Sequence, residues 1–496
     1  MAKTLTTVTP DDAPVPGAGQ TPRRRVFNWL DRRAGVNALL HEALDEPLPG
    51  GARLAYVFGS GLLFLFLSQV ITGVFLALYY VPSADHAHTT IAYIVKQVAA
   101  GSFLRSLHAY GSSAVVVILL LHLMQTFLYG SYKGRRELLW ISGCLLFALM
   151  IGMAFTGYLL PWDQKAYFAT AVGSNIASEV PLIGEALKRL MRGGTDMGTL
   201  TVSRFFVAHV FLIPAGIFAL IATHVFLFRK AGAAGPISED LIAPKQKTEK
   251  FYPRQLVMDM GFALLLIVAL GVLSYVAPVE IGPRANPADT QYLPRPEWYY
   301  LPMFQWLKYW AGARAFIGIV VIPLIVVGLF VGLPFIDRGL ERRPWKRPIA
   351  VGAFALIFFS LVGLGVISHR EDQRNPGVAE QLARQRTETE KFMRQPFEPE
   401  TSGATLVAAN AALSDPLAAK GKEVYQAQSC SACHGEAGTG TTAGPRLIGV
   451  GSRIPPDKLA DMLKQPTEAM MAGGMTPIEV SDEEMKALVA YLNIIK

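Results

Sequence analysis

Seven long runs of apolar residues divide the chain, and shorter segments rich in Lys, Arg, Gly and Pro separate them. Each run is close to the ~20 residues that a helix needs to cross the hydrocarbon core of a bilayer. Hydrophobic residues make up 51% of the 496 residues, which favours an integral membrane protein. We therefore predict an all-α fold with seven membrane-spanning helices, at about residues 55–81, 107–130, 139–160, 205–229, 255–276, 315–335 and 348–367.

Basic residues gather in the N-terminal segment and in three connections between the apolar runs. Lys and Arg are frequent in residues 131–138, 229–254 and 336–347. The net charge of +8 therefore lies mostly between spans and does not indicate nucleic-acid binding. Cytoplasmic loops of membrane proteins carry an excess of Lys and Arg, so we expect all four segments to face the cytoplasm. Seven spans then place the C-terminus on the outer side of a bacterial inner membrane.

The chain before the first span has two parts. Residues 1–25 are rich in Pro, Gly and Thr, and we predict a disordered cytoplasmic tail. Residues 26–50 combine apolar and charged positions in a way typical of a short amphipathic helix at the membrane surface.

Four histidines lie inside two of the apolar runs, as one pair in each. His108 and His122 are 14 residues apart, and His209 and His224 are 15 apart. At ~1.5 Å per residue, each helix carries two imidazoles on one broad face, about 21 Å apart along its axis. A single such histidine could bond a neighbouring helix or line a polar cavity, but two pairs at matched spacing favour axial ligands of haem iron. The second and fourth runs cross in the same direction. His108 should therefore pair with His209 near the outer surface, and His122 with His224 near the cytoplasmic surface.

Four glycines repeat at the same interval in the neighbouring runs. Gly59 and Gly73 lie 14 residues apart in the first run, and Gly143 and Gly157 lie 14 apart in the third. Missing side chains at this repeat could admit the flat faces of two haems. Glycine also promotes close helix packing in membranes, so the spacing alone leaves both interpretations open.

The loop before the sixth run contains the sequence Pro296-Glu297-Trp298-Tyr299, followed by an aromatic stretch. It could be an ordinary interfacial loop with an aromatic belt. Alternatively, Glu297 accepts a proton from a substrate that binds at the outer membrane edge.

The polar segment 369–414 is predicted to be a linker, partly helical, and residues 415–496 a separate domain. This domain contains Cys430, Cys433 and His434 in a C-x-x-C-H motif, which attaches c-type haem covalently with the histidine as axial ligand. Haem is attached in this way outside the cytoplasm, which agrees with the predicted side of the C-terminus.

The sixth ligand of this haem is expected to be a methionine sulfur, which raises the potential relative to a second histidine. Met475 lies in a Gly-rich loop 41 residues after His434 and is our first choice. Met470 and Met471 are alternatives. The third cysteine, Cys144, lies in an apolar run and is expected to pack there.

Residues 26–368 strongly resemble the cytochrome b subunit of quinol–cytochrome c reductases, and residues 415–496 resemble a small class I cytochrome c. The first resemblance rests on the histidine pairs, the four glycines, Gly157-Tyr158-Leu159-Leu160-Pro161-Trp162 and the Pro-Glu-Trp-Tyr sequence. The 15-residue spacing, Pro161-Trp162-Asp163-Gln164 and three spans after the fourth resemble the chloroplast-type branch. That branch attaches an extra haem through a cysteine in the first span. Val57 stands there, so we expect no covalent haem in the membrane.

The resemblance implies a function and further site residues. It implies two non-covalent haems b and one covalent haem c, with quinol oxidised near Glu297 and Tyr299. One electron would pass to a separate Rieske iron–sulfur protein and on to cytochrome c, here the fused domain. The other would cross both haems b to a quinone on the cytoplasmic side, with proton translocation.

The resemblance also implies roles for three further residues. Arg105 would contact a haem propionate, and Arg229 and Asp259 would lie near the inner quinone, although Arg229 could equally be a positive-inside anchor. Further complex subunits, a homodimeric complex and a downstream cytochrome c or terminal oxidase are also implied.

Other classes of protein fit the chain less well. A dihaem b-type anchor of a hydrogenase or formate dehydrogenase usually has fewer spans and lacks Pro-Glu-Trp-Tyr. A membrane-tethered electron carrier would not need four histidines inside the membrane. A transporter would be expected to carry substrate carboxylates or broken helices instead.

Overall fold

The computed structural model describes residues 21–237, 248–287, 289, 291–310, 312–397, 415–435, 438, 444–467, 470–471 and 475–495. The chain divides into two compact units, Met1–Phe397 and Glu398–Lys496. The described residues are mostly helical, as predicted. Their one sheet is an antiparallel pair of short strands, β1 (Pro47–Pro49) and β2 (Thr248–Lys250).

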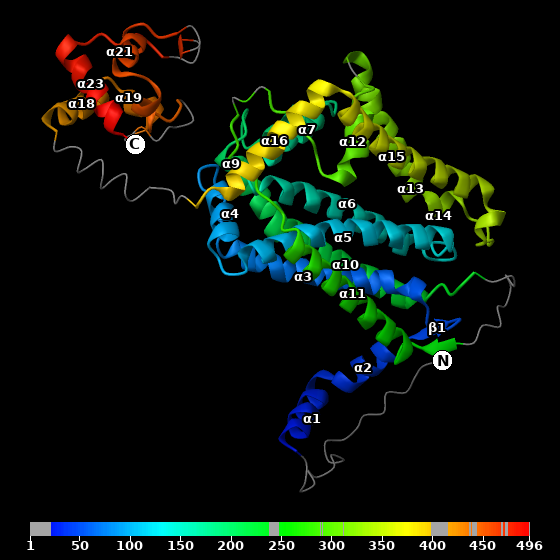
Figure 1. Ribbon diagram of the computed structural model, residues 1–496. Coiled ribbons are helices and arrows are strands. Elements are labelled where there is room, and N and C mark those ends of the chain that lie inside the picture. Colours follow the sequence, from blue (N-terminus) through cyan, green and yellow to red (C-terminus); the bar gives the residue numbers. More distant parts are fainter. Residues whose placement is uncertain are drawn as a thin grey trace. The chain divides into compact units, whose positions relative to one another are not determined.

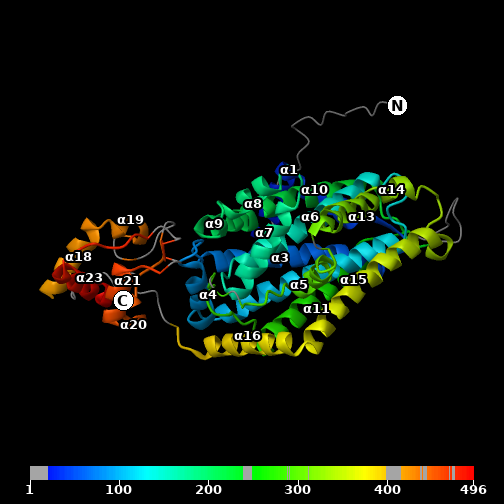
Figure 2. The ribbon, with the colours of Figure 1, turned by 90° about the horizontal axis from the view of Figure 1, so that it is seen from above.

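Four long helical segments form the centre of the first unit, and they lie side by side in Figures 1 and 2. Helix α3 packs on α5, and α6 packs on α10. A fifth long helix, α11, packs against α3 and α5. The bounds are α3 Val57–Ala77, α5 Gly101–Leu128, α6 Glu137–Leu159, α9 Thr199–Val207, η2 Ala208–Leu212, α10 Ile213–Ala231 and α11 Arg254–Val276.

Shorter elements cover the ends of this bundle. They are η1 Leu54–Tyr56, α4 Ala87–Lys96, α7 Gln164–Ser178, α8 Gly184–Arg192, η3 Trp298–Tyr300, α12 Leu301–Leu307, η4 Gly312–Arg314 and η6 Pro344–Lys346.

Six helices in the described part of the chain are long and apolar enough to cross a membrane. They correspond to the predicted runs one to five and seven, the last being α15 (Pro348–Arg374). Apolar side chains point outward from them, for example Leu264, Leu265 and Val268 on α11, each more than half exposed. An apolar exterior is what a lipid-facing bundle requires, because lipid replaces water around it.

The predicted sixth span, 315–335, forms a shorter helix than expected. It consists of η5 (Ile317–Val321) and α13 (Ile322–Val331), followed by a single turn, α14 (Leu333–Ile336). Prolines 323 and 334 interrupt the backbone hydrogen bonding there. Two tryptophans hold its ends: Trp306 Nε1 donates to the carbonyl of Gly318 (2.7 Å), and Trp140 Nε1 donates to that of Phe330 (2.9 Å).

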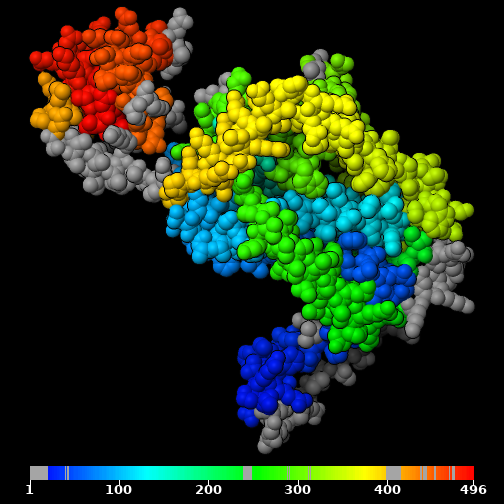
Figure 3. All heavy atoms as spheres, in the orientation of Figure 1, coloured from blue at the N-terminus to red at the C-terminus, as the bar shows by residue number. Residues whose placement is uncertain are grey.

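The first half of the predicted linker is a docked helix. Helix α16 (Pro376–Arg394) is capped at its amino end by Asn375, whose side chain accepts a hydrogen bond from the Gly377 amide at 3.1 Å. Its end is held by Lys96, which donates to the carbonyls of Phe392 (2.6 Å) and Gln395 (2.8 Å). Figure 3 shows α16, in yellow, lying along the surface of this unit. Residues 398–414 of the predicted linker lie outside the described residues.

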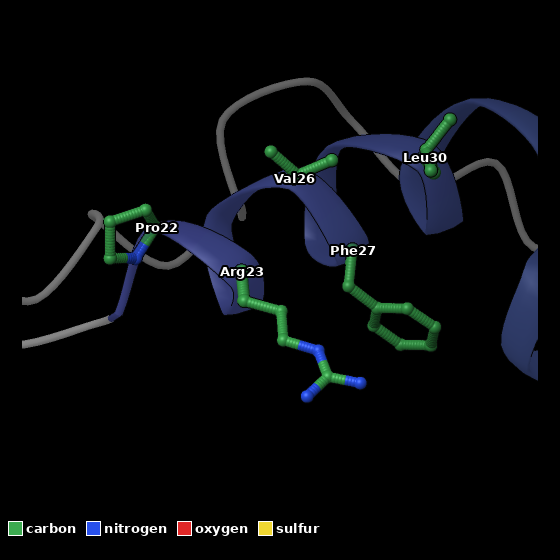
Figure 4. Close-up of a pocket in the computed structure, with 5 residues that line it drawn as sticks. All are labelled: Pro22, Arg23, Val26, Phe27 and Leu30. Atoms are coloured by element: carbon green, nitrogen blue, oxygen red, sulfur yellow. The ribbon is translucent and has the colours of Figure 1, made fainter.

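The N-terminal segment forms α1 (Pro22–Ala34) and α2 (Val36–Leu44). Helix α1 begins within the segment predicted as a disordered tail, because Pro22 at its first turn favours a helix start; residues 1–20 lie outside the described residues. Val26, Phe27 and Leu30 line a shallow hollow on it beside Arg23 (Figure 4). This mixture of exposed apolar and basic side chains matches the predicted amphipathic helix.

The second unit has helices around its own core. They are α18 Pro416–Ala427, α19 Cys430–His434, α20 Val450–Arg453, α21 Pro456–Lys464 and α23 Asp482–Ile494. Helices α18 and α23 pack closely at Gly421, which has no side chain. A Cβ at this position would overlap the carbonyl of Ala487. Tyr425 and Leu488 are completely buried between them.

Candidate redox sites

The histidine pair expected at the outer side, His108 and His209, is called the outer pair, and it is assembled across the bundle. His108 comes from α5 and His209 from η2, and their ring centres lie 6.2 Å apart with the rings tilted by 76°. Two imidazoles that bind one metal ion from opposite sides, each with a metal–nitrogen bond of ~2 Å, have ring centres roughly 6 Å apart. The spacing of these two rings therefore fits a pair of axial ligands to one haem iron.

The inner pair is built from the same helices, with His122 on α5 and His224 on α10. A Cβ on Gly59 would lie 3.7 Å from Cε1 of His122, and a Cβ on Gly143 would lie 3.3 Å from Cε1 of His224.

The two remaining glycines stand against the outer pair. A Cβ on Gly73 would lie 3.2 Å from Cε1 of His108, and a Cβ on Gly157 would collide with the ring of His209. Each of the four glycines thus faces one of the four histidines. This arrangement favours clearance for the ligand rings over general helix packing.

A π-helical turn explains the unequal spacing of the histidines. His209 lies in η2, and a π turn holds one residue more than an α turn. Pro214 lacks the N–H that would bond to the carbonyl of residue 210 in an α-helix, which favours such a widening. The 15 residues from His209 to His224 therefore cover about the same rise and rotation as the 14 from His108 to His122. Regular helical geometry misses this, although Pro214 is the signal for it.

Hydroxyl groups fix the orientation of three histidine rings. The bonds are Thr72 Oγ1 to His108 Nδ1 (2.9 Å), Ser142 Oγ to His224 Nδ1 (2.8 Å) and Thr156 Oγ1 to His209 Nδ1 (3.4 Å). His209 Nδ1 also lies 3.1 Å from the carbonyl of Met153.

The direction of these bonds follows from the other partner of each hydroxyl. Thr72 donates to the carbonyl of Ser68 at 2.8 Å, and Ser142 to that of Leu139 at 2.8 Å. Each hydroxyl hydrogen is thus already used, so the oxygen accepts from the imidazole Nδ1–H. Nε2 is then the unprotonated nitrogen, which is the form that binds a metal.

One histidine lacks this partner. Nδ1 of His122 is buried and makes no hydrogen bond. The three hydroxyl residues each precede one of the glycines directly, whereas Phe58 precedes Gly59. Sequence reasoning missed these hydroxyls, although the repeated Thr-Gly and Ser-Gly pairs carry the signal.

The loop that leads into η3, called the outer loop after its expected side, presents Glu297 beside a lysine that sequence reasoning did not single out. Glu297 Oε1 accepts from Lys165 Nζ at 2.7 Å, and Lys165 lies in the first turn of α7. Burial raises the pKa of the Tyr299 phenol, so Tyr299 keeps its proton and can donate a hydrogen bond. The loop is anchored by Tyr300, whose hydroxyl donates to the carbonyl of Ile151 at 2.9 Å.

Arg105 lies near the outer pair, three residues before His108. Its guanidinium donates to the carbonyl of Val279 (2.7 Å) and to that of Glu280 (3.3 and 3.2 Å). In this arrangement Arg105 ties the loop after α11 to α5.

The two residues suggested for an inner quinone site, Asp259 and Arg229, lie on different helices, α11 and α10. Asp259 is buried and accepts from Gln255 Nε2 at 2.8 Å, and Gln255 in turn accepts from the backbone of Arg53 at 2.8 Å. Arg229 lies in the last turn of α10. Asp259 therefore belongs to a buried polar cluster at the start of α3 and α11.

The C-terminal unit arranges its haem motif on α19. His434 Nδ1 lies 2.7 Å from the carbonyl of Pro445, which orients the ring and leaves Nε2 for a metal. Cys430 and Met475 pack against the same core, whereas Met471 is 49% exposed. This packing favours Met475 over Met471 as the sixth ligand.

Comparisons with known proteins identify the membrane unit. Residues 43–232 match the family model "Cytochrome b/b6/petB", and residues 284–384 match "Cytochrome b(C-terminal)/b6/petD". The menaquinol:cytochrome c reductase cytochrome b subunit of Bacillus subtilis is 41% identical over 221 residues, which cover 43% of this chain and 99% of that protein.

The chain belongs to the cytochrome b family. The cytochrome bc complex cytochrome b subunit of Chlorobaculum thiosulfatiphilum is 35% identical, over 68% of this chain and 80% of that one. A chain of a solved structure titled "Hyperthermophilic respiratory Complex III" aligns with a TM-score of 0.63 at 27% identity, covering 74% of this cytochrome b and 96% of that chain. The protein is thus a cytochrome b subunit of a bc-type complex rather than an anchor of another enzyme.

This cytochrome b carries a cytochrome c domain on the same chain. Residues 416–492 match the family model "Cytochrome C oxidase, cbb3-type, subunit III". The "Cytochrome b/c1" of Bradyrhizobium diazoefficiens is 33% identical over 70% of this chain and 50% of its own length. Haem b and haem c are therefore both cofactors of this subunit, and the predicted fusion is confirmed.

Proposed function

We propose that this chain is the quinol-oxidising cytochrome b/c subunit of a proton-translocating quinol–cytochrome c oxidoreductase. Quinol is oxidised at the outer side, near Glu297 and Tyr299. One electron passes through a separate Rieske iron–sulfur protein to the fused cytochrome c domain, and the other crosses the membrane to a quinone on the cytoplasmic side. Two relatives are named as menaquinol:cytochrome c reductase subunits, so menaquinol is the first substrate to test.

The observation that carries this proposal is the outer histidine pair, whose ring centres lie 6.2 Å apart. His209 faces Gly157 near the end of α6, and α7, which carries the lysine paired with Glu297, follows that end of α6. His108 and His209 would hold one haem b, and His122 and His224 the second. Gly59, Gly73, Gly143 and Gly157 leave room for these rings. When bound, the haems supply one-electron carriers across the bilayer. The chain contributes their ligands, spacing and orientation.

The outer loop would handle the quinol itself. Glu297 is the one acid of the Pro-Glu-Trp-Tyr sequence, and its carboxylate is one-third exposed, so it can accept a proton from quinol and release it outward. Tyr299 keeps its proton and can position the substrate by hydrogen bonding. Arg105 would contact a haem propionate through the guanidinium N–H groups that the carbonyls of residues 279 and 280 leave over.

The inner side would reduce quinone. Asp259, buried beside Gln255, is the candidate proton donor, and Arg229 at the end of α10 is the candidate for orienting the ring. Positively charged loops on this side agree with the cytoplasm as the source of the protons.

The fused domain would hold its haem covalently through Cys430 and Cys433, and His434 and Met475 would bind its iron. We propose seven spans, with η5 and α13 crossing between the two tryptophan contacts, which puts this domain on the periplasmic side. A terminal oxidase or another cytochrome c would take its electrons. Further bc subunits and a homodimeric complex are part of the proposal.

Replacing Glu297 with Gln tests the outer site. The amide keeps the shape but cannot take up the proton, so we expect quinol oxidation to fall about 100-fold with haem content unchanged. The assay is quinol-driven reduction of cytochrome c in membranes, with reduced-minus-oxidised spectra as the haem control. Normal turnover in this variant would remove Glu297 from the mechanism.

A further inference from the structure

Lys165 and Glu297 form an ion pair at the outer site, although 132 residues separate them in the chain. Resting on the proposed proton role of Glu297, we propose that Lys165 is the positioning residue that draws the ionised Glu297 carboxylate toward the outer water and so directs proton release outward.

The ammonium group of Lys165 contacts the loop that carries Glu297, and both side chains are partly exposed. Lys165 Nζ lies 2.7 Å from Glu297 Oε1 and 5.7 Å from the centre of the Tyr158 ring. The lysine side chain is 46% exposed and that of Glu297 33% exposed. Asp163 caps the amino end of the same helix, accepting from the Ala166 amide at 2.8 Å, which fixes the backbone that carries Lys165.

The ion pair is not what holds the loop in place. Arg295, two residues before Glu297, donates to both carboxylate oxygens of Asp372, at 2.8 and 2.6 Å, and this second pair is largely buried. Tyr300 is bonded to α6 as described above. An ion pair as exposed as Lys165–Glu297 contributes little to stability. Its contribution should therefore appear in turnover rather than in folding.

The lysine attracts only one of the two protonation states of Glu297. In the proposed step the O–H bond of quinol breaks, an O–H bond forms on Glu297, and the electron leaves through the redox path described above. The neutral acid no longer attracts the ammonium group. When the acid gives its proton to outer water, the attraction returns and holds the carboxylate on the solvent side. Lys165 keeps its own proton throughout and neither gains nor loses an electron.

The test compares Lys165→Met and Lys165→Arg in the assembled complex, each alone and combined with Glu297→Gln. With the proton role intact, Lys165→Met should lower kcat for quinol-driven cytochrome c reduction about threefold to fivefold with KM unchanged, which is the scale of an exposed ion pair. Lys165→Arg, which keeps the charge, should retain turnover within about twofold of the unmodified chain. In the Glu297→Gln background, Lys165→Met should change nothing further, because the charge it acts on is gone.

Other outcomes overturn the inference. An equal fall in both backgrounds, a rise of KM without a fall of kcat, failure of arginine to restore turnover, or unchanged kcat would each contradict it. Reduced-minus-oxidised spectra of each variant control for haem loss, and Lys165→Gln replaces the methionine variant if that one does not assemble. Failure of the proposed role of Glu297 can be distinguished from failure of the proposed role of Lys165. Full turnover of Glu297→Gln alone removes the proposed proton role, whereas a slow Glu297→Gln with a normal Lys165→Met removes only the role of the lysine.

Discussion

The outer and inner histidine pairs use the same four helical segments but differ in the groups behind their rings. Both outer rings have a hydrogen-bonded Nδ1, through Thr72 and through Thr156 with Met153. In the inner pair only His224 is bonded, through Ser142, and Nδ1 of His122 has no partner. The histidines and glycines therefore repeat at both ends of the bundle, whereas the hydroxyl groups that orient the imidazole rings are present for only three of the four histidines.

This difference has a direction. A hydrogen bond from Nδ1–H strengthens an imidazole as a metal ligand, which stabilises the oxidised iron and lowers the potential. The inner site has one such bond fewer. We therefore predict a higher potential for the inner haem b than for the outer one, so that electron transfer away from the proposed quinol-oxidising side is favourable.

The largest effect is expected from removing a ligand of one pair only. Replacing His122 with Asn should abolish the inner haem b while the outer haem b and haem c remain, so the b band in a reduced-minus-oxidised spectrum should fall by about half. His108→Asn is the matched variant and should leave the inner haem. A b band of unchanged amplitude in either variant would refute the ligand assignment.

A smaller change at the glycine repeat should affect the same haem. Gly143→Val puts branched carbon atoms where a single Cβ already lies 3.3 Å from His224, so the ring must move and inner haem binding should weaken, about 10-fold or more. The control is Gly261→Val on α11, where a Cβ meets nothing within 4 Å. Equal haem b content in the two variants would show that Gly143 provides no clearance.

These variants also separate what sequence could predict from what it could not. The spans, the histidine pairs and the glycine repeat were predictable, because each depends on periodicity within one or two helices. The π turn at His209 was hidden by the assumption of regular helices. The Lys165–Glu297 pair and the docking of α16 by Lys96 depend on contacts between segments far apart in the chain. The shorter helix at 317–331 results from Pro323 and Pro334, and a hydropathy pattern does not report the effect of proline on helix length.

The smallest effect is expected from removing single hydroxyls. Thr72→Ala should raise the potential of the outer haem b only, and Ser142→Ala that of the inner haem b only. A hydrogen bond of ~1 kcal/mol corresponds to roughly 40 mV for one electron, which sets the scale of each shift. Potentiometric titration of the b bands measures both, and each variant serves as the control for the other. Shifts of the same haem in both variants would contradict the assigned pairing.

We propose that the two histidine pairs hold two unequal haems b, one at each end of the bundle. Potentiometric titration of the purified native complex tests it most directly, with His122→Asn used to assign the components. We expect two one-electron b components, of which the one with the higher potential disappears in His122→Asn. A single b component, or the loss of the lower-potential component in that variant, would contradict it.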